Sequence, residues 1–236
     1  MVIGGLASAA LLAVCGLSAY FLVADERQGR QAQIAETAPT AIPRDISSRE
    51  VDPEPLTEKE VFPNSEIVIS VNEPPYQVLR TQENKDCRKA VAGEIAKLLT
   101  ELGCSQVVRG TLRAPNSAYL VTAGVFNLRD IAAAETAHEK IKPLVNNKKG
   151  RFQGMVAGEG TDAIALSSAQ VGWHIRGHYL VYCVIARADG EPVTDVDPYA
   201  RQILYDMIEL HLRGDVLEKR ATVPVDEASP SPASSS

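Results

Sequence analysis

Apolar residues follow two different periods along this chain, and one segment carries no charge at all. The uncharged segment is Val2–Ala24. As a helix it would extend about 35 Å, enough to cross a bilayer core, so residues 1–24 are predicted to form a transmembrane anchor. A cleaved signal peptide is an alternative, although no Lys or Arg precedes the segment and its cleavage site is poor. A lipid-modified Cys15 is a second alternative.

The orientation of this anchor is open on the sequence alone. Arg27 and Arg30 follow the span and no basic residue precedes it, which by the positive-inside rule favours a cytoplasmic C-terminal part. An N-terminal span followed by one polar domain is, however, the usual layout of an exported protein. We therefore expect a single-pass protein of the cell membrane with an extracytoplasmic domain.

The segments at the two ends of the polar part lack periodic apolar residues. Residues 25–65 are rich in Pro, Ser and acidic side chains, and residues 222–236 are rich in Pro, Ser and Ala. Such segments bury too little surface to fold alone. They predict a disordered tether and a disordered tail around one globular domain at residues 66–221.

Three segments of this domain repeat apolar residues at helical spacing, over residues 86–102, 130–145 and 197–213. Asp197 followed by Pro198 is typical of a helix start. Pro143 is expected to end or bend the second helix early. The apolar face of the first helix would consist of Val91, Ile95, Leu98, Leu99 and Leu102.

Strand patterns fill the spaces between these helices. Strands are predicted at 105–114, 118–128 and 151–157, and in two further runs that meet near Arg176. The last run is apolar on both faces and should be covered on both sides. The order α-β-β-α-β-β-β-α predicts an α+β fold, ferredoxin-like, with helices packed on one face of an antiparallel sheet.

The charge of the chain restricts its partners. A net charge of −6 and 5% aromatic residues argue against nucleic-acid binding. One basic run interrupts this acidic background and could meet an acidic envelope polymer or lipid head groups, although a solvated helix end is the preferred explanation. The run consists of Lys140, Lys142, Lys148, Lys149 and Arg151.

Three cysteines lie in the predicted domain. Cys87 and Cys104 bracket the first helix, and a continuous helix would hold them about 20–25 Å apart, too far for a disulfide. In a ferredoxin-like sheet, Cys183 would lie near Cys87. We therefore expect a Cys87–Cys183 bridge if any forms, with three buried thiols as the alternative.

The segment VGWHIRGHY contains the candidate site, which is His174, Arg176 and His178. A two-residue loop at Arg176-Gly177 would place the two histidines on opposite faces of a hairpin, whereas a three-residue loop would make them face each other. A structural hairpin is the preferred interpretation. The sequence contains no motif for a catalytic residue, a metal or a cofactor.

Segments within residues 80–220 resemble single-pass membrane proteins common in high-GC actinobacteria. The resemblance rests on DCRKAVAGEIAKLLTELGCSQVVRGTL, YLVTAGVFNL and VGWHIRGHYLVYCVIARADG. It implies an N-terminal anchor and one extracytoplasmic α+β domain, without an activity. YLVTAGVFNLRDIAAAETAHEKIKPL is also faintly similar to half of a SPOR domain, which implies binding to peptidoglycan glycan strands.

These observations predict a membrane-anchored protein of the cell envelope that binds or senses an unidentified ligand. Its partners would be the bilayer, through residues 2–24, and an envelope polymer or protein. Two alternatives stay open, an envelope enzyme with an unrecognised site near His174 and His178, and a peptidoglycan-glycan binding module.

Overall fold

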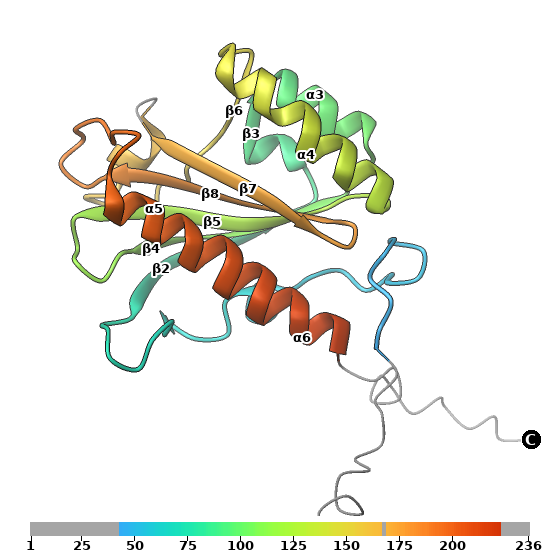
Figure 1. Ribbon diagram of the computed structural model, residues 1–236, viewed down its shortest axis with the longest axis horizontal. Coiled ribbons are helices and arrows are strands. Elements are labelled where there is room, and N and C mark those ends of the chain that lie inside the picture. Colours follow the sequence, from blue (N-terminus) through green and yellow to red (C-terminus); the bar gives the residue numbers. More distant parts are fainter. Residues whose placement is uncertain (1–42, 167–168, 223–236) are drawn as a thin grey trace, which may run out of the picture. The chain divides into compact units, whose positions relative to one another are not determined.

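A six-stranded antiparallel sheet organises residues 43–166 and 169–222, the part of the chain that the computed structural model describes (Figure 1). A smaller two-stranded sheet pairs β3 (Val91–Gly93) with β6 (Gly150–Phe152). The strands of the large sheet are, in spatial order, β1 (Glu66–Ile67), β2 (Tyr76–Asn84), β4 (Gln106–Arg113), β5 (Tyr119–Asn127), β8 (Tyr179–Arg187) and β7 (Gln170–Arg176).

The predicted α+β class and the predicted order of elements are confirmed. The chain runs through α3 (Glu94–Glu101), β4, β5, α4 (Ile131–Asn146), β6, β7, β8 and α5 (Pro198–Tyr205), with β1 and β2 ahead of them. As predicted, Asp197 caps α5 and Pro198 opens it. Pro143 lies within α4, which continues to Asn146. All strand pairs are antiparallel, and their order does not confirm a ferredoxin-like arrangement.

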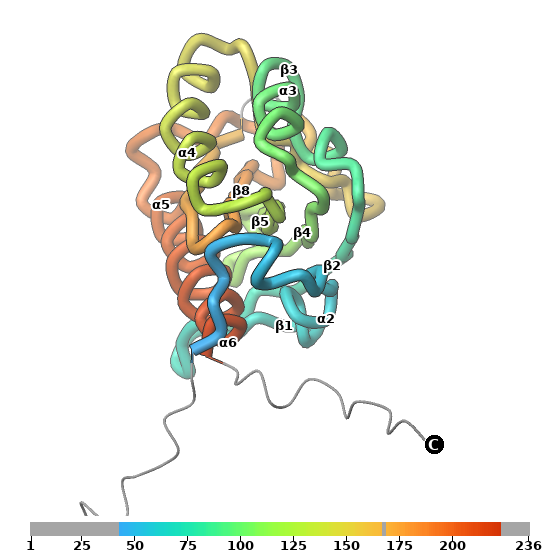
Figure 2. Tube along the Cα trace, turned by 90° about the vertical axis from the view of Figure 1, so that its right-hand side faces the viewer, coloured from blue at the N-terminus to red at the C-terminus, as the bar shows by residue number. Residues whose placement is uncertain are grey.

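Helices cover both faces of the large sheet, so the prediction of helices on one face is wrong. α3 and α4 lie on one side, and α5 continues on the other side through the π-helix η3 (Asp206–Val216) into α6 (Leu217–Thr222) (Figures 1 and 2). The cause is visible in β5 and β8, whose residues are buried almost without exception. Strands that are apolar on both faces need cover on both sides.

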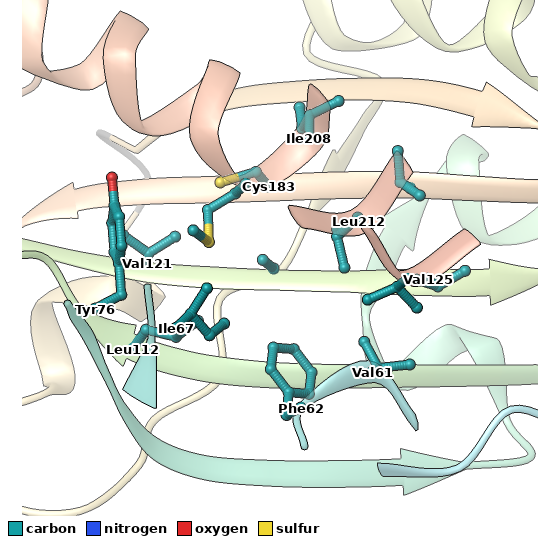
Figure 3. Packing of buried hydrophobic residues seen from close by; sticks show 14 of the residues in the cluster. Val61, Phe62, Ile67, Tyr76, Leu112, Val121, Val125, Cys183, Ile208 and Leu212 are labelled. Carbon is teal, nitrogen blue, oxygen red and sulfur yellow. The ribbon is translucent and has the colours of Figure 1, made fainter. Parts of the chain in front are cut away.

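The second half of the predicted tether belongs to the fold, which corrects the boundary at residue 65. Leu56, Val61 and Phe62 are fully or almost fully buried, and α2 (Glu58–Val61) is capped by Thr57. Figure 3 shows Val61 and Phe62 packed in the same core as strand residues and the C-terminal helix. The Phe62 ring lies over Gly110, where an added Cβ would come within 2.8 Å of it.

The first predicted helix is broken in its first half. Residues 87–89 form a single 3₁₀ turn, residues 91–93 form β3, and α3 begins only at Glu94. Gly93 turns the chain with a φ of 66°, and the Glu94 N–H donates to the carbonyl of Lys149. Pairing of β3 with β6 therefore replaces the helical hydrogen bonds that periodicity predicted.

The β7–β8 hairpin turns one residue later than either predicted register. Arg176 pairs with Tyr179 and His174 pairs with Val181, so the two-residue loop is Gly177-His178. Gly177 has a φ of 56°, which suits a glycine in a hairpin loop. An added Cβ at Gly177 would lie 2.1 Å from the Ile46 carbonyl, so tertiary contact with the N-terminal segment also requires glycine here.

The predicted anchor at 1–24, Cys15 and tail residues 223–236 lie outside the described residues. Thr222, predicted to belong to the tail, is the last residue of α6. Among the helices of residues 43–166 and 169–222, none has the length and apolarity needed to cross a bilayer.

Candidate functional site

The structure separates the two histidines that the sequence placed in one candidate site. His178 is fully buried, and its Nδ1–H donates to the Ile46 carbonyl at 2.9 Å. The half-buried His174 instead accepts a hydrogen bond at Nδ1 from the Ile175 N–H, at 2.7 Å. Arg176, the third residue of that candidate site, pairs with Glu218 of α6. The three side chains thus have separate structural partners and form no shared site.

His138 of α4, rather than His178, is the ring neighbour of His174. Their ring centroids are 5.2 Å apart, and the Trp173 Nε1–H donates to the His138 carbonyl. Burial, followed by the proximity of His174, lowers the pKa of His138. Within the described part of the chain, no group of three or more His, Cys, Asp or Glu side chains could hold a metal ion. The pair therefore gives no metal site.

A buried polar network joins the N-terminal segment to the C-terminal helix. Two nitrogens of the Arg220 guanidinium, Nε and Nη2, donate to the Asp52 carboxylate at 2.7 and 2.9 Å. The Tyr179 hydroxyl donates to the same carboxylate at 2.6 Å. Burial alone would raise the pKa of Asp52, but the hydrogen bonds from Arg220 and Tyr179 hold it below its usual value. All three side chains are internal and mutually satisfied, which is typical of a structural network.

A cleft beside the β3–β6 sheet has a volume of about 920 Å³. Its size falls in the range of small-molecule sites. It lies between the end of α4, the two short strands, the 3₁₀ turn η2 (Asp162–Ala165) and the start of β7. The cleft takes side chains or backbone from four separate parts of the chain, which the fold brings together.

Among residues 43–166 and 169–222, four basic side chains and no acidic one line this cleft. They are Lys89, Lys148, Lys149 and Arg151, and all four are exposed. None of them forms an ion pair with another residue of the described ranges. In a chain of net charge −6, this is a local excess of positive charge. A cleft lined by one sign of charge attracts ligands of the opposite sign.

Apart from Gln153 and three glycines, the other described residues that line the cleft are apolar. Phe152, Ile164 and Val184 are buried at its base, and Leu166 is half exposed at its edge. Phe152 stacks on Tyr182 at a centroid distance of 5.2 Å and contacts Trp173 at 5.8 Å. Because Trp173 is the only tryptophan of the chain, its fluorescence reports on this wall.

A disulfide joins Cys87 and Cys104 next to the cleft, so the predicted Cys87–Cys183 bridge is wrong. The Cα atoms of Cys87 and Cys104 are 6.3 Å apart because the chain between them folds back instead of forming a continuous helix. Cys183 is buried in the opposite core, and burial raises the pKa of its thiol. The disulfide fixes the turn that carries Lys89, two residues from Cys87.

The basic run of the sequence is divided between the cleft and the rest of the surface. Lys148, Lys149 and Arg151 line the cleft, whereas Lys140 and Lys142 do not. Lys89 was missed, because residues 86–102 were expected to form one helix far from the run. The apolar wall was also missed, since Ile164 and Leu166 lie in a segment without a clear period.

Comparisons of the chain with protein-family models, with curated proteins and with solved structures give no match. The candidate site therefore stands on its own geometry.

Proposed function

We propose that this chain is a membrane-anchored binding protein of the cell envelope whose folded part binds an anionic ligand in the β3–β6 cleft. The observation that carries the proposal is a set of four cationic side chains that line one cleft of an acidic chain and have no ion-pair partner in the part of the chain that the structure describes. The uncharged segment 2–24 supports the anchor, and the resemblance to single-pass actinobacterial proteins supports the layout.

The disulfide supports an extracytoplasmic location for the folded part. Disulfides persist in oxidising compartments and are rare where thiols are kept reduced. The Cys87–Cys104 bridge has the Cα separation that a disulfide requires, within the folded part. An exported domain is therefore preferred over the cytoplasmic orientation that Arg27 and Arg30 favour by charge alone.

An alkaline phosphatase fusion joined after residue 42 tests the location. The described fold begins at residue 43, so the fusion does not contain it and the phosphatase activity does not depend on whether the domain folds. Because alkaline phosphatase is active only after export, an active fusion is the expected result. A well-expressed but inactive fusion would place the domain in the cytoplasm.

Titration of the purified full chain with anions, from pyrophosphate to dodecyl phosphate, tests the site at low ionic strength. We expect Trp173 fluorescence to change with at least one anion, because the Trp173 ring packs on the cleft wall. The double variant Lys148→Glu/Lys149→Glu should weaken that binding about tenfold or more, since it reverses two charges at the cleft. The matched control, Lys140→Glu/Lys142→Glu, changes charge equally on α4 without touching the cleft. Equal effects of the two variants, or no response to any anion, would refute the proposed site.

A further inference from the structure

We infer that the anionic ligand of the cleft is a lipid, with its phosphate among the four cations and its hydrocarbon chain against the apolar wall. This inference rests on the proposed function, since it specifies the ligand of the same cleft. Two features of the lining carry it. The first is the set of four cations that have no ion-pair partner in the described ranges, and the second is the half-exposed Leu166, whose aliphatic surface a small polar anion would leave in contact with water.

The apolar wall is continuous with the cationic rim. Arg151 and Phe152 are neighbours in β6, and the rim residue Arg151 is exposed while Phe152 is buried. Across the cleft, Leu166 presents aliphatic surface and is 50% exposed, whereas the neighbouring lining residue Ile164 is buried. An exposed leucine at the edge of a cleft gains stability when a hydrocarbon chain covers it. Phosphate alone would use the rim and leave the exposed surface of Leu166 hydrated.

The volume of the cleft fits an amphiphile better than a simple anion. Clefts of roughly 300–1,000 Å³ hold molecules of drug size. At about 920 Å³, this cleft is near the top of that range, and an inorganic phosphate would occupy a small part of it. A lipid head group together with the first part of its hydrocarbon chain would occupy both the cationic rim and the apolar wall.

The predicted anchor would bring the cleft to a bilayer. Figure 1 shows β3 and β6 at the end of the domain away from the start of the described chain. A domain of this size is about 40 Å across, whereas residues 25–42 can extend to about 60 Å. The linker is thus long enough for the cleft to turn back towards the membrane. Such tethering keeps the local lipid concentration high, and anionic lipids attract clustered Lys and Arg.

Photo-crosslinking of the full chain in nanodiscs tests the inference. The discs contain phosphatidylcholine with either phosphatidylglycerol or no anionic lipid, and the probe is phosphatidylglycerol with a diazirine in its acyl chain. We expect mass spectrometry to map the crosslinks to the apolar wall, around Ile164, Leu166 and Val171. A phosphatidylcholine probe with the same diazirine should give at least tenfold fewer crosslinks there.

Matched variants separate this inference from the proposed function. Lys148→Glu/Lys149→Glu should abolish the wall crosslinks, and Lys140→Glu/Lys142→Glu should retain them. Leu166→Gln, a change at an exposed position, should reduce the crosslinks severalfold. Lysine-dependent binding of pyrophosphate without lipid crosslinks would overturn the lipid inference and leave the proposed function standing. If neither the crosslinks nor the anion binding depends on Lys148 and Lys149, the lipid inference and the proposed function are both overturned.

Discussion

His178 and His211 lie in the interior, and each donates one ring N–H to a backbone carbonyl of the N-terminal segment. His178 Nδ1 donates to Ile46, and His211 Nε2 donates to Val61 at 3.0 Å. Burial lowers the pKa of both rings, in His211 to about 4. His178 was a candidate site residue because it lies close to His174 and Arg176 in the sequence. In the structure its ring instead holds the β7–β8 loop against the backbone of Ile46. A buried side chain of this kind cannot be told from a catalytic one by sequence alone.

We predict that His211 makes the fold sensitive to mild acid. Above pH 6.5, the ordinary pKa of histidine, the ring is neutral in the folded and unfolded chains, so its contribution is fully present. As the pH falls below 6.5, the unfolded chain gains a proton that the folded chain accepts only near pH 4. The free energy of unfolding should therefore fall by about 2 kcal/mol between pH 7 and pH 5 through this residue.

Urea unfolding at the two pH values, followed by Trp173 fluorescence, measures this effect. His211→Gln keeps a donor for the Val61 carbonyl but does not titrate, so its pH-dependent loss should be about 2 kcal/mol smaller than that of the wild type. His138 and His178 act in the same direction and remain in the variant, which therefore keeps a residual slope. An identical pH slope in wild type and variant would contradict the prediction.

Among the secondary-structure elements, the sequence predicted best those that stand on their own periodicity. β4, β5 and α4 were predicted to within a residue at each end, because alternation or helical spacing continues along each of them. The start of α5 was also predicted, whereas the helical run after it continues to Thr222 instead of ending at residue 213. The segment before α3 failed, since its apolar residues fit a helix while its hydrogen bonds go to β6 instead. That single misassigned turn also produced the wrong disulfide, because the distance between Cys87 and Cys104 was calculated along a straight helix.

We predict that the Cys87–Cys104 bridge stabilises the fold and, through the turn it closes, the cleft. Two cysteines separated by 17 residues close a loop whose cross-link contributes about 3 kcal/mol. Cys87→Ser/Cys104→Ser should lower the free energy of unfolding by about that amount in urea and weaken anion binding at Lys89. Dithiothreitol should reproduce the loss in the wild type and leave the double variant unchanged. Equal stability of oxidised and reduced wild type would refute the prediction.

At the scale of the whole molecule, the sheet is enclosed by two cores, and the N-terminal segment completes one of them. Sequence patterns indicated strands that are apolar on both faces but not which segments would cover them. Part of the cover comes from residues 46–62, which have isolated apolar residues rather than a period. The cleft was partly predictable for a related reason: its lysines form a visible run, whereas Lys89 and the apolar wall reach it only through tertiary folding.

We predict that residues 43–62 are required for folding, although they lie in a segment with the composition of a linker. Removing them deletes four buried side chains, Ile46, Leu56, Val61 and Phe62, and uncovers the core that they contact. The free energy of unfolding should fall by about 6–12 kcal/mol, at about 1.5–3 kcal/mol per buried side chain. The deletion also leaves the buried Arg220 without Asp52, which costs about a further 3–5 kcal/mol. This sum reaches or exceeds the roughly 5–15 kcal/mol that stabilises a typical domain. A fragment of residues 43–222 should therefore unfold cooperatively in circular dichroism, whereas a fragment of residues 63–222 should show no cooperative transition. A shared melting temperature in the two fragments would show that the segment is dispensable, and the core contacts of Phe62 would then contribute little to stability.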